Sequence, residues 1–125
     1  MSLRFFLFGI AWLSAMLLLF LTPTGVAQQY FFESVPARAV VHCVLFWGFV
    51  HLWVCALKKQ SRYEVLRRKA FIIVFVSALG LGLISEICMY AFGISSTFSL
   101  WNLAFDVIGA GLGLITFRLL YASCY

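Results

Sequence analysis

Residues 100–121 read LWNLAFDVIGAGLGLITFRLLY, and this stretch decides the fold. It is almost wholly apolar, and a helix of this length, rising about 1.5 Å per residue, crosses the roughly 30 Å hydrocarbon core of a bilayer. Its polar and glycine residues, with one serine just before it, recur every three or four positions: Ser99, Asn102, Asp106, Gly109, Gly113 and Thr116. Residues at this spacing share one face of a helix. Because a polar face does not point at lipid, the stretch predicts a transmembrane helix packed against other helices.

The whole chain has the composition of a membrane protein. Of its 125 residues, 65% are hydrophobic and only 10% are charged, and the mean hydropathy is +1.07. Soluble domains carry about a quarter charged residues. Three further apolar runs span about 5–21, 39–57 and 70–92, and none alternates as a barrel strand does. We therefore predict an all-α membrane protein with a single domain over residues 1–125, built as a bundle of four transmembrane helices.

Positive charge predicts the orientation of this bundle. Cytoplasmic loops of membrane proteins are enriched in Lys and Arg. Six of the nine basic residues lie between the second and third runs: Lys58, Lys59, Arg62, Arg67, Arg68 and Lys69. Arg4 and Arg118 flank the first and last runs on the same side, so both termini are expected inside. The net charge of +5 thus reflects topology rather than nucleic-acid binding, although a polybasic loop can also hold anionic headgroups.

The first run has a second interpretation, as a cleaved signal peptide. Arg4 would supply its basic end, and Gly25-Val26-Ala27 would supply its cleavage site. The run is longer than the apolar core of a usual signal peptide, and its removal would leave three spans. We therefore expect it to be retained as a transmembrane helix.

Two short motifs predict where helices begin. Ser34 followed by Pro36 predicts a start near Val35, because serine caps helix starts and proline is tolerated in the first turn. The segment Ser61-Arg62-Tyr63-Glu64 has the spacing of a capping box. It predicts that the third long helix begins well before residue 70.

The four cysteines show no CxxC pair and no zinc-ligand spacing: Cys43, Cys55, Cys88 and Cys124. Cys43 and Cys88 both fall toward the predicted outer face, so a disulfide between them is conceivable. The favoured interpretation is that all four are small apolar membrane residues. No metal and no cofactor are expected.

Glu86 and Asp106 are the most informative residues, because they are two of only four acidic residues and both lie inside apolar runs. An ionisable group within a membrane is costly and marks a functional site by default. Counting about 1.5 Å per residue, Glu86, Asp106 and His42 each lie within about 10 Å of the outer end of their helix. We therefore predict an outward-facing, ligand-binding polar pocket within the membrane: Arg38, His42, Glu86, Ser99, Asn102 and Asp106.

Helical phase supports one pocket rather than scattered polar groups. Arg38 and His42 share a face one turn apart, and Glu86 shares a face with the small or flexible residues Gly82, Met89 and Gly93. In the last helix, Gly109 and Gly113 continue the polar face inward and let a neighbouring helix approach closely.

The chemistry of the pocket is left open by the residues. His42, Glu86 and Asp106 are the catalytic candidates, because histidine titrates near neutral pH and can form an acid–base pair with a carboxylate. The same three could hold a divalent cation, but no ligand spacing indicates it. No nucleophile motif is present. Alternatively, the polar groups form a buried network that only locks the helices together, although such contacts normally use Ser, Thr, Asn or Gln.

The layout resembles the VanZ-like family of small bacterial membrane proteins over nearly the whole chain. The first helix exits through Phe20-Leu21-Thr22-Pro23, similar to that family's Ser/Thr-Leu-x-Pro-like exit, and His42 precedes aromatic residues as its histidine does. Glu86 is similar to its Glu-x-x-Gln. The segment from Ser99 to Gly113 is similar to its Ser-x-x-Asp-x3-Asn-x2-Gly-x3-Gly.

This chain departs from the family pattern at several positions. Asn102 and Asp106 stand where the family has Asp and then Asn, so the acidic group moves by one turn. Met89 replaces the glutamine, and Arg38-Ala39 replaces an acidic-basic pair. An arginine expected before the last helix is missing.

The resemblance implies a role in the bacterial cell envelope, in a multi-pass protein of the cytoplasmic membrane. The family's namesake is associated with resistance to the glycopeptide teicoplanin. The leading hypothesis is that the pocket binds or modifies the headgroup of an envelope lipid or lipid-linked precursor. Alternatives are a small proton-coupled exporter and a structural subunit of a membrane complex. A homo-oligomer or another membrane partner is compatible with each.

Overall fold

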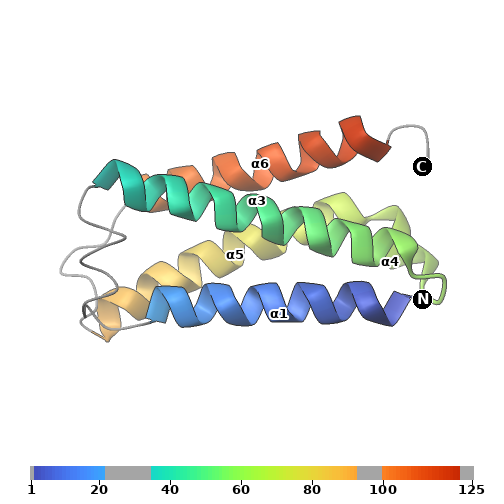
Figure 1. Ribbon diagram of the computed structural model, residues 1–125, viewed down its shortest axis with the longest axis horizontal. Helices are drawn as coiled ribbons and strands as arrows, with labels where there is room; N and C mark the ends of the chain where they lie inside the picture. Colours follow the sequence, from blue (N-terminus) through green and yellow to red (C-terminus); the bar gives the residue numbers. More distant parts are fainter. Residues whose placement is uncertain (1, 22–34, 93–99, 122–125) are drawn as a thin grey trace.

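The computed structural model describes residues 2–21, 35–92 and 100–121, and this part of the chain is helical with no strand. The helices are α1 (Ser2–Leu21), α3 (Val35–Lys59), α4 (Glu64–Arg68), α5 (Ala70–Ala91) and α6 (Leu100–Tyr121) (Figure 1). The prediction of an all-α fold is confirmed for these residues. Outside them lie the proposed cleavage site, Ser99, Gly93 and Cys124.

Three of these helices contain stretches long and apolar enough to cross a membrane: Val40–Lys59, Ala70–Ala91 and Asn102–Tyr121. The apolar part of α1 is shorter, Leu3–Leu19. Large apolar side chains stand exposed along the helices, among them Val76, Ile84 and Leu119. Soluble proteins rarely expose apolar surface on this scale, whereas lipid tails cover it without cost. The chain is therefore a multi-pass membrane protein.

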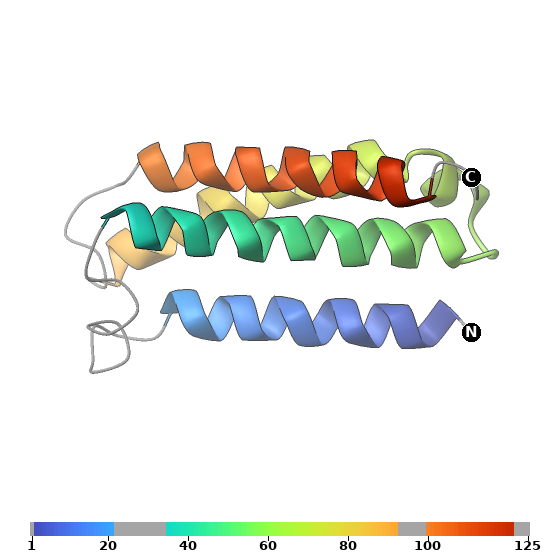
Figure 2. The ribbon, with the colours of Figure 1, turned by 45° about the horizontal axis from the view of Figure 1, so that its top comes forward.

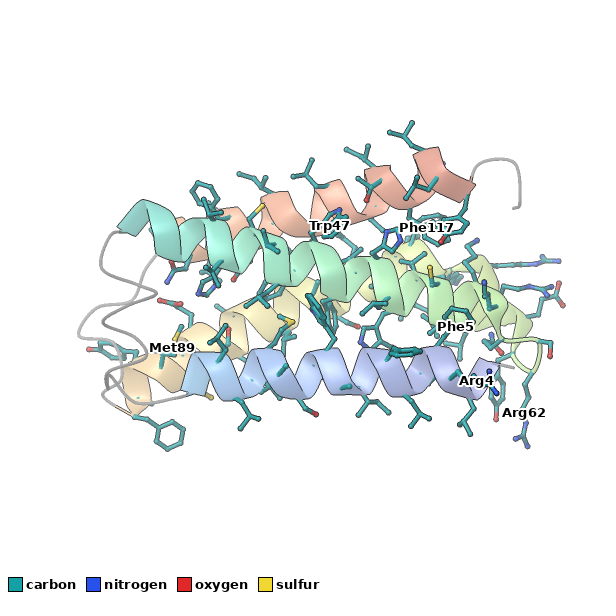
Figure 3. The ribbon with its side chains drawn as sticks, in the orientation of Figure 1. Arg4, Phe5, Trp47, Arg62, Met89 and Phe117 are labelled. Atoms are coloured by element: carbon teal, nitrogen blue, oxygen red, sulfur yellow. The ribbon has the colours of Figure 1, made fainter. Side chains whose placement is uncertain are left out.

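The long helices run side by side, with α3 in contact with α1, α5 and α6 (Figures 1 and 2). The start of α1 and the end of α6 lie at the same end of the bundle as α4 (Figure 1). Arg4 and Arg62 lie at this end (Figure 3). Arg118 on α6 and Lys58 on α3 also meet there, because both lie over the ring of Phe71. These basic residues thus gather at one end of the bundle, which we call the basic end.

Close contact between α3 and α6 depends on two glycines. A Cβ at Gly109 would collide with the backbone carbonyl of Cys43, and one at Gly113 would lie 2.9 Å from the carbonyl oxygen of Trp47. Trp47 Nε1 also donates to Thr116 Oγ1 at 2.9 Å. Both glycines thus lie where α3 and α6 approach closely, the place at which the sequence pattern leads us to expect helix packing.

Helix α1 is held to α3 by aromatic residues packed on glycines. The indole of Trp12 fills the space that a Cβ at Gly48 would need, and its Nε1 donates to Leu45 O at 2.9 Å. In the other direction, Gly9 of α1 packs on the ring of Trp53.

The start of α3 at Val35 agrees with the prediction, but the capping box is wrong. Tyr63, not Ser61, precedes α4, with no side-chain cap. The Gln60 side chain closes the turn instead: its Oε1 accepts from the Tyr63 N–H at 2.8 Å, and its Nε2 donates to Tyr63 O at 2.5 Å. The Glu64 carboxylate, which would complete a capping box, instead pairs with the Arg68 guanidinium at 2.6 Å. The short helix α4 thus precedes α5 as a separate element, and the helical conformation is interrupted at Lys69 between them.

Candidate functional site

Four polar side chains meet where α3, α5 and α6 pack together, and we call them the polar cluster: His42, Glu86, Asn102 and Asp106. Each is only 1–2% exposed. The cluster lies toward the end of the bundle opposite the basic end. Met89, one turn beyond Glu86 on α5, marks that region in Figure 3, far from Arg4 and Arg62.

The closest contact in the cluster joins α3 to α6. His42 Nδ1 and Asp106 Oδ1 are 2.8 Å apart, and both side chains are almost fully buried. With Nδ1 as the donor, a neutral imidazole keeps Nε2 as an acceptor, whereas a protonated ring would form an ion pair with the carboxylate. The pair can therefore hold or pass on a proton without a large change in its position.

The second contact joins α5 to α6. Asn102 Nδ2 donates to Glu86 Oε2 at 3.4 Å, which is long for a hydrogen bond. Asn102 and Asp106 are one turn apart on α6, so their partners also lie next to each other. Two carboxylates, one imidazole and one amide thus form a single group within the membrane-spanning part of the protein.

Asp106 keeps one oxygen that the described residues do not satisfy. Its Oδ2 is buried and has no hydrogen-bond partner among them. The oxygen lies against Gly82 of α5, where an added Cβ would be 2.9 Å away. Gly82 therefore makes room for the Asp106 carboxylate, a role that the sequence analysis did not assign to it.

A sequence signal for this contact exists in hindsight. Gly82 lies four residues before Glu86, and Asp106 lies four residues after Asn102. In antiparallel neighbouring helices these offsets run in opposite directions, so a pair Glu86–Asn102 aligns Gly82 with Asp106.

The structure brings together four of the six predicted pocket residues. Arg38 lies on α3 one turn before His42, but its side chain is outside the described part of the chain, as is the whole of Ser99. On α5, Gly82 and Met89 are buried on the face of Glu86, as the helical phase predicts.

Other chemistry finds little support among the described residues. Within residues 2–21, 35–92 and 100–121, no group of three or more His, Cys, Asp or Glu side chains is placed to hold a metal ion. Ser85, which precedes Glu86 on α5, donates to Gly82 O of its own helix. Cys43 and Cys88 are free thiols, so the conceivable disulfide between them is not formed.

Comparison of the chain with protein-family models, curated proteins and solved structures finds no match. Function is therefore inferred from the polar cluster and from the sequence motifs.

Proposed function

We propose that this is a VanZ-like four-helix membrane protein, with both termini in the cytoplasm, whose polar cluster binds or modifies a polar headgroup of an envelope lipid or lipid-linked precursor. The observation that carries the proposal is the buried His42–Asp106 pair beside a second carboxylate, with Asp106 Oδ2 lacking a partner among the described residues.

Orientation follows from the basic end. Lys and Arg collect on the cytoplasmic side of membrane proteins, and the start of α1, the end of α6 and α4 all lie at the basic end (Figure 1). With this end in the cytoplasm, the polar cluster lies in the outer half of the membrane. It is then at a depth that an outer-leaflet headgroup can approach.

Energetics support a functional role over a purely structural one. A buried acceptor without a donor, such as Asp106 Oδ2 within the described residues, destabilises the folded protein by about 1–3 kcal/mol. A network that served only to hold the helices together would be more stable without it. A hydroxyl or ammonium group of a ligand would satisfy Asp106 Oδ2. The two carboxylates favour ligands that donate hydrogen bonds, such as sugar hydroxyls or a primary amine.

Access to the cluster is expected between α5 and α6. The glycine contacts at Gly109 and Gly113 hold α6 tightly on α3. By contrast, the Asn102–Glu86 hydrogen bond between α5 and α6 is long, at 3.4 Å. Parting these two helices would expose Asp106 without disturbing its bond to His42.

The test compares Asp106→Asn and Glu86→Gln with Glu64→Gln, an exposed acidic residue at the basic end. Native mass spectrometry of detergent-purified protein would measure binding of phosphatidylethanolamine and of undecaprenyl-linked sugars. We expect the two cluster variants, and not Glu64→Gln, to lose binding while helix content is retained. If they change only thermal stability, or if the unmodified protein binds neither probe, the cluster is a structural lock and the chain is better described as a partner subunit.

A proton-coupled exporter is the second candidate. It is favoured by the burial of the His42–Asp106 pair, which can hold a proton. Against it, small multidrug resistance transporters, which also have four helices, carry their key Glu in the first helix. Helix α1 of this chain has no acidic residue. Substrate-dependent proton release from the solubilised protein would favour this candidate, and its absence would exclude it.

A further inference from the structure

We infer that a second lipid site lies between the polar cluster and the basic end of the molecule: a groove between α1, α3 and α5 that takes an acyl chain of an anionic phospholipid from the cytoplasmic leaflet. This inference does not depend on the proposed function of the polar cluster. It rests on a cavity, on the charges beside it and on the missing counter-ions of those charges.

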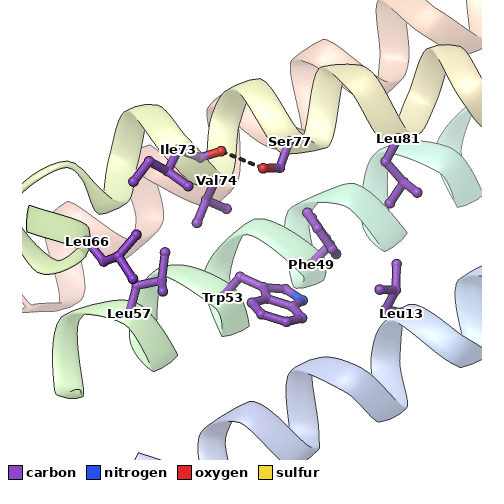
Figure 4. Close-up of a pocket in the computed structure, with 9 residues that line it drawn as sticks. All are labelled: Leu13, Phe49, Trp53, Leu57, Leu66, Ile73, Val74, Ser77 and Leu81. Atoms are coloured by element: carbon purple, nitrogen blue, oxygen red, sulfur yellow. Dashed lines mark hydrogen bonds between the residues drawn. The ribbon is translucent and has the colours of Figure 1, made fainter. Parts of the chain in front are cut away.

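The cavity has a volume of about 370 Å³ (Figure 4), within the range of about 300–1,000 Å³ of ligand pockets. Its lining comes from four helices: Leu13 of α1, Phe49, Trp53 and Leu57 of α3, Leu66 of α4, and Ile73, Val74, Ser77 and Leu81 of α5. Ser77 has the one hydroxyl in this lining, and it donates to Ile73 O at 2.7 Å (Figure 4). The cavity therefore offers a ligand an apolar surface.

The cavity is open along the seam between α1 and α5. Ser77 is exposed, and Ile73 and Leu81 are half-buried. Helix α1 packs mainly on α3 and touches α5 less. In a bilayer such an opening faces lipid tails, so an acyl chain can enter from the side.

Charge selects the headgroup. Leu57 and Leu66 line the cavity toward the basic end, and three basic residues gather there on the side of α1. The ammonium of Lys59 lies 4.3 Å from the centre of the Phe5 ring, next to Arg4, and Arg62 follows in the turn after α3. Arg4, Phe5 and Arg62 lie together at this end in Figure 3.

These three cations lack counter-ions within the described residues. The one acidic residue of that part of the structure, Glu64, is bound by Arg68 at 2.6 Å. Lys58 and Arg118 are turned to the other face, over Phe71. A phosphate group at the membrane surface would neutralise Arg4, Lys59 and Arg62 while its acyl chain filled the cavity. An apolar groove ending in uncompensated positive charge fits an anionic phospholipid better than a neutral one.

Adjacent residues on α3 supply a matched pair of variants. Lys59→Gln removes a cation on the groove side, and Lys58→Gln removes the same charge on the opposite face. Native mass spectrometry of the full chain in detergent would measure binding of phosphatidylglycerol and of phosphatidylcholine with the same acyl chains. We expect tighter binding of phosphatidylglycerol, weakened about fivefold by Lys59→Gln and unchanged by Lys58→Gln.

A variant that fills the groove tests the acyl chain. Ser77→Phe places a ring in the opening of the groove. The hydrogen bond that is lost, from the Ser77 hydroxyl to Ile73 O, lies within α5. Helix content and melting temperature should therefore be unchanged. Binding of both lipids should fall together, while binding at the polar cluster should not change.

Three results would overturn the inference. They are equal binding of the two lipids by the unmodified protein, equal weakening by the two lysine variants, and a change of oligomeric state in Ser77→Phe with lipid binding intact. The last result would identify the groove as a contact between copies of the chain. Loss of binding in the cluster variants alone would bear on the proposed function and not on this site.

Discussion

Replacing Gly109 with Ala should be far more damaging than the same change two residues later at Gly111. Both glycines lie within α6, but a Cβ at Gly111 would have no atom within 4 Å. At Gly109 it would meet the Cys43 backbone, with the carbonyl carbon and the Cα both at 2.9 Å. Backbone atoms cannot turn aside as a side chain can, so α3 and α6 must separate.

The structure sets the size of the effect. Ordinary contact begins near 3.4 Å, so the 2.9 Å contacts must lengthen by roughly half an ångström, and the carbonyl oxygen of Cys43, which is closer still, must move by more. The His42–Asp106 bond of 2.8 Å is beside this contact, since His42 precedes Cys43 and Asp106 lies three residues before Gly109. Overpacking costs about 1–3 kcal/mol, and weakening a buried polar pair adds to it. The higher helix propensity of alanine compared with glycine offsets at most about 1 kcal/mol of this destabilisation.

We therefore expect Gly109→Ala to lower the free energy of unfolding by about 1–4 kcal/mol and Gly111→Ala to leave it unchanged or raise it by up to about 1 kcal/mol. Reversible unfolding in mixed micelles with rising SDS, followed by circular dichroism, would measure both. Equal stabilities for the two variants would show that α3 and α6 do not pack at Gly109, and the description of the polar cluster would have to change with it.

Three further predictions follow from the same structure. Gly82→Ala would crowd the Asp106 carboxylate and should destabilise the protein by about 1–2 kcal/mol, whereas Gly80→Ala, with open space around it, should be neutral in the same unfolding assay. A cysteine in place of Glu64, in a background without the native cysteines, should react with a membrane-impermeant maleimide in inverted vesicles and not in intact cells; labelling of intact cells would reverse the proposed orientation. Expression of the protein in a teicoplanin-sensitive bacterium should reduce the susceptibility of the cells to teicoplanin, and Glu86→Gln should abolish this reduction at equal protein levels. An unaltered susceptibility with the unmodified protein would contradict the envelope role.

Much of the fold could be predicted because the signals are local. The apolar runs match the helices, since hydrophobic length is read residue by residue. The start of α3 at Val35 was predictable from Ser34 and Pro36. The turn before α4 was not, because the sequence alone does not say that Gln60, rather than Ser61, closes it.

The sequence by itself determined that the protein is helical and membrane-embedded, and it predicted that His42, Glu86 and Asp106 lie at a similar depth. Only the tertiary structure decided that His42 pairs with Asp106, that Asn102 pairs with Glu86, and that a groove opens between α1 and α5. Depth follows from counting residues along each helix, whereas pairing depends on the rotation of each helix and on its register to less than one turn. Those are set by contacts between distant residues, above all where the Gly109 and Gly113 backbone meets α3.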